Sequence, residues 1–206
     1  MSAREVVLRR VQEALADVPS SEPVARAYVE SGGSPRERVV TAFVERVRDY
    51  RATVVRADGV RNAVSEAFAA ERASRVGVAT DLDTALRPPG LELVADRRLT
   101  HAELDALDGA LTTCAVACAA TGTIALDGGP GQGRRALTLV PDLHVCVVRE
   151  EQIVETVPEL VRRLEQAARL GKPIVLVSGP SATSDIELQR VEGVHGPRRL
   201  VLIVAP

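Results

Sequence analysis

Apolar residues recur with helical spacing in the first third of the chain. In residues 2–17 they are spaced as on one face of an amphipathic helix: Val7, Val11, Ala14 and Leu15. Serine, proline and glycine break this pattern over residues 18–34, which is typical of a linker. Ser34, Pro35 and Glu37 then form a capping box with proline in the first helical turn. We therefore divide the chain into an N-terminal helical arm and linker, residues 1–34, and a main domain, residues 35–206.

Short β-type runs alternate with helical patterns at the start of the main domain. The runs are 53–55, 76–79 and 91–94, and a helix preceded by Asp58 as a capping residue lies between the first two. This alternation predicts an α/β fold, with a mostly parallel sheet flanked by helices.

The pattern changes between residues 100 and 150. Four β-type runs follow one another there, at 112–117, 123–126, 136–140 and 145–148, and they predict a small antiparallel β insert. The glycine-rich stretch at 128–133 precedes a β-type run, whereas a dinucleotide-binding loop would open a helix. We therefore interpret this stretch as a hairpin turn.

The α/β rhythm resumes near the C-terminus. Thr156 and Glu159 form another capping box, and the helix that they begin ends at Gly171. Residues 174–177 form an uninterrupted aliphatic run, which is typical of a central strand buried on both faces. We expect residues 201–204 to form the neighbouring strand. The loops that flank these two strands, 178–187 and 193–197, should therefore approach each other.

Composition excludes several classes of function. The 206 residues carry a net charge of −2 and only four aromatic residues, so the basic surface and stacking rings of a nucleic-acid-binding protein are missing. No apolar run is long enough to span a membrane, and charged residues interrupt the first 20 positions, so no signal peptide is expected. We expect a cytoplasmic protein with no membrane span and no nucleic-acid partner.

The three cysteines point to packing. A metal site could be assembled from four residues: Cys114, Cys118, His144 and Cys146. However, there is no Cys-x₂-Cys spacing, and three cysteines in apolar segments are typical of small buried side chains. We predict no disulfide and no metal site.

The densest polar cluster runs from Ser178 to Glu187, directly after the aliphatic run. Its hydroxyl and carboxylate side chains would suit a small anionic or carbonyl ligand at the carboxyl end of a strand. The candidate binding residues are Gly179, Ser181, Thr183, Asp185 and Glu187. Ser184 and Glu187 also form a capping box, so a purely structural turn is the alternative.

Two shorter motifs add candidates. Thr121, Gly122 and Thr123 place a glycine between two hydroxyls, where the backbone could approach a ligand closely. His195 lies between glycines on a loop, where an imidazole suits a proton shuttle or a donor to a carboxylate. An ordinary bend and a hydrogen-bonded loop histidine are the respective alternatives. No catalytic triad can be assembled from these residues.

Taken in order, these motifs resemble a known family. Thr121-Gly122-Thr123, Leu143-His144, the run Gly179-Pro180-Ser181-x-Thr183-x-Asp185-Ile186-Glu187 and Gly193-Val194-His195-Gly196-Pro197 are similar to the LUD domain of the lactate-utilisation protein C family (LutC/YkgG). The resemblance covers residues 35–206, so the main domain is interpreted as a LUD domain. Family members often have an acidic residue before Thr-Gly-Thr, where this chain has Ala120.

The resemblance implies a NagB/RpiA/CoA-transferase-like fold and a part in bacterial oxidation of L-lactate to pyruvate. It implies that the chain acts with iron–sulfur and accessory partner proteins. The chain lacks the repeated Cys-x₂-Cys spacing that holds a cluster, so no redox cofactor is expected in the chain itself. The chain would then be a non-redox organiser or ligand-binding component, with a small carboxylate or phosphate-like ligand. The alternative is a free-standing enzyme similar to CoA transferases or sugar-phosphate isomerases, acting on a small anionic substrate. No catalytic residue is assigned.

Overall fold

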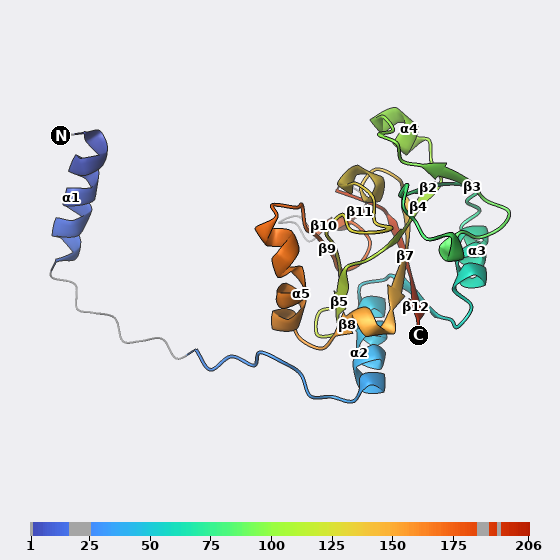
Figure 1. Cartoon of the computed structure of the whole chain (residues 1–206), viewed down its shortest axis with the longest axis horizontal. Coiled ribbons are helices and arrows are strands. Elements are labelled where there is room, and N and C mark those ends of the chain that lie inside the picture. The colour runs from blue at the N-terminus through green and yellow to red at the C-terminus, as the bar shows by residue number, and fades with distance from the viewer. Residues whose placement is uncertain (1, 17–25, 185–189, 193–194) are drawn as a thin grey trace.

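A six-stranded, all-parallel sheet forms the centre of the molecule (Figure 1). The computed structural model describes residues 2–16, 26–184, 190–192 and 195–206. The sheet order is β1-β12-β7-β4-β2-β3. Its strands are β1 (Thr53–Arg56), β2 (Arg75–Val78), β3 (Glu92–Ala95), β4 (Gly109–Thr113), β7 (Leu143–Arg149) and β12 (Arg199–Ala205).

A second sheet has four strands in the order β8-β5-β6-β9. These are β5 (Val116–Cys118), β6 (Thr123–Leu126), β8 (Ile153–Val154) and β9 (Val175–Val177). β6 pairs antiparallel with β5 and with β9, whereas β8 runs parallel to β5. A separate two-stranded hairpin consists of β10 (Ala182–Ser184) and β11 (Arg190–Glu192).

Five helices and three 3₁₀ turns complete the described chain. The helices are α1 (Ala3–Leu15), α2 (Arg36–Asp49), α3 (Val60–Ala70), α4 (His101–Asp105) and α5 (Val157–Arg169). The turns are η1 (Thr84–Leu86), η2 (Arg135–Thr138) and η3 (Glu150–Gln152). No helix among these residues is long and apolar enough to cross a membrane.

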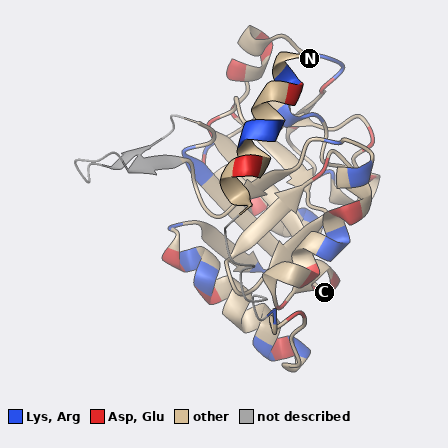
Figure 2. Ribbon diagram, turned by 90° about the vertical axis from the view of Figure 1, so that its left-hand side faces the viewer, with Lys and Arg blue, Asp and Glu red and all other residues tan. Residues whose placement is uncertain are grey.

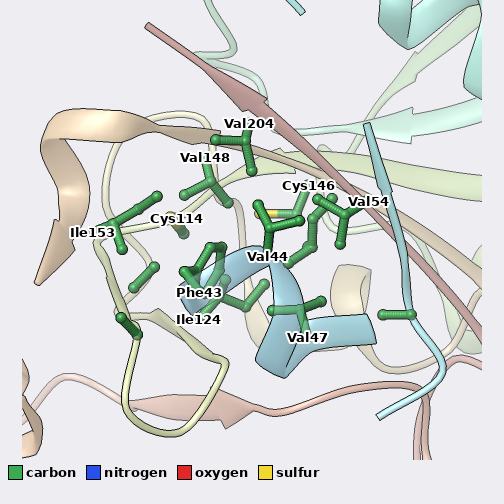
Figure 3. Packing of buried hydrophobic residues seen from close by; sticks show 14 of the residues in the cluster. Phe43, Val44, Val47, Val54, Cys114, Ile124, Cys146, Val148, Ile153 and Val204 are labelled. Atoms are coloured by element: carbon green, nitrogen blue, oxygen red, sulfur yellow. The ribbon is translucent and has the colours of Figure 1, made fainter. Parts of the chain in front are cut away.

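The elements stack in layers because each strand of the main sheet is apolar on both faces. On one face, α3 buries Phe68 and Val64 against Val145 and Ile203 of the sheet. On the other face, Phe43 and its neighbours on α2 pack with side chains of both sheets, among them Cys146, Val204 and Ile124 (Figure 3). The outer face of the four-stranded sheet is covered by α5 through Leu160 and Leu164. The predicted α/β fold, with a mostly parallel sheet flanked by helices, is confirmed. The antiparallel insert is smaller than predicted: residues 145–148 belong to β7 and residues 112–113 to β4, both in the parallel sheet, and only β5 and β6 of the predicted runs lie in the second sheet.

The predicted position of residues 174–177 is wrong. This segment forms β9, an edge strand of the four-stranded sheet, and β12 pairs instead with β1 and β7. An aliphatic run is also compatible with an edge strand that has only one covered face. In β9, Val175 and Val177 pack against the core, while Leu176 is 59% exposed. A central strand and an edge strand of this kind share an aliphatic sequence, and they differ in whether side chains are buried on both faces or at alternate positions only.

Three further local predictions need correction. Residues 136–140 contribute to η2 instead of a strand, because one helical turn buries Leu137 against Leu104 and Ala110. The glycine-rich stretch at 128–133 is therefore a loop between β6 and η2 and not a hairpin turn. Ser34 caps no helix: its hydroxyl donates to Glu155 Oε1 at 2.7 Å, and α2 starts after Pro35 without a side-chain cap. At η2 and at Ser34, a distant partner outweighs the local signal.

The predicted N-terminal helix is present as α1. Ser2 and Glu5 form a capping box at its start, and none of its residues is buried. Val7, Leu8, Val11 and Leu15 therefore expose an apolar stripe.

The two phenylalanines allow a test of the layered core. Phe43 and Phe68 are both fully buried, on opposite faces of the main sheet. We expect Phe43→Ala and Phe68→Ala each to lower the free energy of unfolding by ~3–5 kcal/mol, because each leaves a cavity in close-packed surroundings. Urea denaturation measures the change, and Val161→Ala, at a position 58% exposed, serves as the control with little effect. Near-neutral phenylalanine variants would contradict this assignment of the core.

Candidate functional site

The two C-terminal motifs meet through backbone and hydroxyl contacts. The Ser181 N–H donates to the Pro197 carbonyl at 2.8 Å, and the His195 N–H donates to Ser181 Oγ at 3.1 Å. The predicted proximity of the two loops is thus confirmed for their described residues. The expected cause was adjacent strands, yet β9 and β12 belong to different sheets. The loops therefore lie between the edge strand β9 of the four-stranded sheet and the inner strand β12 of the main sheet.

The Thr-Gly-Thr motif lies beside the start of the same loop. Thr123 Oγ1 is 2.7 Å from Ser178 Oγ and donates to Thr121 Oγ1 at 2.7 Å. Thr123 is only 6% exposed, so this row of three hydroxyls is partly shielded from water. β6 and β9 are paired, which brings residues 121–123 and 178 together. Three motifs separated along the sequence therefore form one cluster.

Gly122 and Gly179 are required by their approach to α2. Both have positive φ angles, 60° and 122°. A Cβ on Gly122 would lie 3.0 Å from the Val47 nitrogen, and one on Gly179 would lie 2.7 Å from Tyr50 Cβ. Any larger residue would push the loops away from the helix. These two candidate residues hold the backbone in place and offer no side chain to a ligand.

A cleft of about 330 Å³ opens next to this cluster. Ser178, Gly179, Ser181 and His195 line it on the loop side. Sequence reasoning missed other lining residues as ligand contacts: Arg135, Thr138 and His144. The available signals were the Arg134-Arg135 pair and the Leu143-His144 motif, but nothing in either shows which cleft they reach. The cleft lies at the amino ends of β7 and β12, since His144 and Leu200 are the second residues of those strands.

His144 is held neutral at the base of this cleft. It is 1% exposed, and its Nε2 lies 2.8 Å from Thr112 Oγ1 on the neighbouring strand β4. Burial lowers the pKa of His144 to about 4. A neutral imidazole contributes a hydrogen bond but no charge near neutral pH. The guanidinium of Arg135 therefore supplies positive charge to the cleft, which suits a small anionic ligand.

The remaining candidates are placed only in part. Thr183 belongs to β10, which is described as backbone. Asp185 and Glu187, together with the proposed capping box of Ser184 and Glu187, lie outside the described residues. The roles of these residues stay predictions.

The cysteines lie within the core. Cys114, Cys118 and Cys146 are buried free thiols. Hydrogen bonding to Cys146 and burial raise the pKa of the Cys114 thiol well above its usual value. A protonated thiol is a poor nucleophile and a poor metal ligand. Among the described residues, no three His, Cys, Asp or Glu side chains are grouped to hold a metal ion.

Charges on the surface are interspersed. Figure 2 shows Lys and Arg alternating with Asp and Glu along the helices of the face that it presents. Ion pairs among the exposed side chains of the described residues include Arg46 with Asp49 and Arg169 with Glu165. This arrangement agrees with the small net charge of the chain.

Comparison with known proteins decides the family. The model of the LUD domain matches residues 40–205. The chain belongs to the LUD domain family. Lactate utilization protein C of Deinococcus radiodurans is 46% identical over 195 residues, which cover 93% of this chain and 86% of that protein. YkgG of Escherichia coli is 39% identical over 74 residues, 34% of this chain and 32% of that protein.

A solved structure shares the fold of this LUD domain. The crystal structure of a DUF162 family protein from Deinococcus radiodurans superposes with a TM-score of 0.74. Its sequence is 39% identical, and the match covers 84% of this chain and all of that one. The resemblance inferred from the motifs is therefore confirmed at the level of family and fold.

The hydroxyl row can be tested by removing one member. We expect Thr123→Val to lower the free energy of unfolding by ~1–3 kcal/mol, because the Thr121 and Ser178 hydroxyls lose their shared partner. Amide hydrogen exchange should also rise at residues 178–181. Thr41→Val, on the exposed side of α2, is the matched control and should change stability by less than about 0.5 kcal/mol. Equal effects of the two variants would contradict a structural role for the row.

The buried imidazole predicts a pH dependence of stability. The unfolded chain binds a proton at His144 below pH 6.5, whereas the folded chain does so only below about pH 4. Stability is therefore full above pH 6.5 and falls as the pH decreases toward 4, by up to about 3 kcal/mol from this group. Denaturant titrations from pH 7 to pH 4 should show a shallower fall for His144→Gln than for the wild type. Parallel curves would mean that His144 is not the responsible group.

Proposed function

We propose that this chain is a subunit of a bacterial system that oxidises L-lactate to pyruvate. It acts with iron–sulfur and accessory partner proteins as a non-redox organiser or ligand-binding component. The observation that carries the proposal is its 46% identity to Lactate utilization protein C over nearly the full length of both chains. Identity of this extent is expected to preserve both the fold and the arrangement of a site.

The chemistry of the chain supports a role without a redox centre of its own. Removing two electrons from a hydroxy acid requires an acceptor, and unmodified side chains provide none at a useful potential. Iron–sulfur clusters are held by four thiolates in most proteins, whereas this chain contains three cysteines, all buried. We therefore assign the electron-carrying clusters to the partners.

The cleft beside the motif cluster is the proposed ligand site. A small carboxylate would pair with the guanidinium of Arg135, and the hydroxyls of Ser178 and Thr138 line the same space. His195 stands at the rim, where its side chain is exposed. Asp185 remains part of the proposal as a polar residue of the same loop.

Lactate-dependent dye reduction tests the proposal. The purified chain alone should show no turnover, and activity should require the chain together with its partners. In the reconstituted system, Arg135→Gln and His195→Ala should each reduce the rate by about tenfold or more, because charged or hydrogen-bonded contacts to the ligand carboxylate are lost. Asp185→Ala should reduce it as well, because the proposed role of this carboxylate is to accept a hydrogen bond from the ligand hydroxyl. Arg97→Gln, an exposed arginine outside the cleft, is the control and should leave the rate unchanged.

Two outcomes would overturn the proposal. The first is full activity of the partners when this chain is omitted. The second is steady turnover by the isolated chain on a small anionic substrate, which would favour the free-standing enzyme similar to CoA transferases or sugar-phosphate isomerases.

A further inference from the structure

A second cleft lies at the opposite ends of the main-sheet strands. It has a volume of about 530 Å³, larger than the cleft beside the motifs. Thr113 ends β4, Arg149 ends β7, and Asp81 follows β2, and all three residues line the space. The cleft is therefore formed at the carboxyl ends of three parallel strands.

The topology of the sheet creates this crevice. From β2 the chain moves outward to β3, then returns across β2 to β4 and continues in the other direction to β7 and β12. After β2 the chain turns to the α3 face, where Leu82 packs with Phe68. After β4 it turns to the α2 face, where Cys114 packs with Phe43. Neighbouring strands whose connections leave on opposite faces open a gap between them, and open α/β sheets bind ligands at such points.

One wall of the cleft is a glycine-rich loop held in a fixed shape. The Gly131 N–H donates to Asp81 Oδ1 at 3.1 Å, and Thr113 Oγ1 donates to the Pro130 carbonyl at 2.7 Å. Asp127 Oδ1 accepts from the Gly129 N–H and from Gln132 Nε2, both at 2.9 Å. Asp83, the third carboxylate of the lining, accepts from the Ala85 N–H at 2.8 Å, so each carboxylate of the cleft already has a backbone donor. The loop needs little rearrangement to receive a ligand.

Other residues of the lining supply positive charge. Arg149 from β7, Arg163 from α5 and Lys172, just after α5, line the cleft and are exposed. Within the described part of the chain, none of the three forms an ion pair, whereas Arg162 and Arg169 on the same helix do. The cleft also contains three carboxylates, but each of them already accepts a backbone N–H, whereas the three cations form no ion pair in the described part of the chain. The cations are therefore the groups left to bind a ligand, and three of them favour one with more than one negative charge. Two of them are guanidinium groups, whose donors match phosphate oxygens in pairs.

We propose that this crevice binds a small molecule carrying a phosphate or diphosphate group. The anionic group contacts Arg149, Arg163 and Lys172. The carboxylates of Asp81 and Asp127 each have further lone pairs, which accept hydrogen bonds from donor groups elsewhere on the ligand. A monocarboxylate such as lactate would neutralise only one of the three cations and is not the expected occupant. The site is separate from the cleft beside the motifs, so it stands independently of the proposed function.

Calorimetric titration of the full chain with inorganic pyrophosphate, at constant ionic strength, tests the site. Saturable binding is expected for the wild type, and the double variant Arg163→Gln/Lys172→Gln should weaken it by about tenfold or more. The double variant Arg162→Gln/Arg169→Gln removes the same charge from the same region but outside the cleft, and it should change the affinity by less than about twofold. Hydrogen exchange at residues 128–133 should slow when pyrophosphate binds.

Further titrations identify the source of the phosphate group. Tighter binding of ADP than of pyrophosphate would indicate a nucleotide, and the reverse order would indicate a smaller phosphate ester; both results support the site. Absence of saturable binding by pyrophosphate and ADP would overturn the proposal. Equal weakening by the two double variants, or displacement of pyrophosphate by an equal concentration of L-lactate, would overturn it as well.

Discussion

Burial of apolar side chains between the two sheets and α2 is the interaction on which the rest of the structure depends. Phe43 and its neighbours on α2 join the main sheet at Cys146 and Val204 to the four-stranded sheet at Ile124 (Figure 3). Burial of a cluster this size stabilises the fold through the hydrophobic effect, with about 1.5–3 kcal/mol for each large side chain. Because the cluster contains residues of three layers, it fixes their relative positions.

The motif cleft exists because of that fixed arrangement. Val177 packs against the cluster and is followed directly by Ser178, so the loop begins at a defined place. Thr123 on the neighbouring strand then supplies the hydroxyl that meets Ser178. Gly122 and Gly179 allow both loops to lie against α2. The cleft is therefore shaped by close contacts between backbone segments, and its hydroxyls lie where the strands place them.

The amino ends and the carboxyl ends of the main-sheet strands carry different clefts. The amino ends of β7 and β12 carry the cleft formed by the sequence motifs, whereas the carboxyl ends of β2 and β4 carry the crevice that the topology creates. The motifs lie at the amino ends of β7 and β12 because residues 121–123 and 178 are at adjacent ends of the paired strands β6 and β9 of the four-stranded sheet. The cations of the crevice come from β7, from α5 and from Lys172, three residues after the end of α5. One fold thus presents two polar clefts of unlike composition.

The sequence by itself determined the features whose causes are local or periodic. Apolar spacing and capping residues predicted four of the five described helices, all but α4. The short β-type runs predicted an α/β fold, and the ordered motifs identified the LUD family. The sequence also indicated that loops 178–187 and 193–197 would meet, as Ser181 and His195 do. Tertiary structure alone decided which sheet each strand joins. An aliphatic run such as 174–177 is compatible with a central strand or an edge strand, and the choice depends on partners far along the chain. The sequence likewise did not show that Arg135 and His144 line the cleft. The packing of elements that are distant in sequence determines which side chains line the same space.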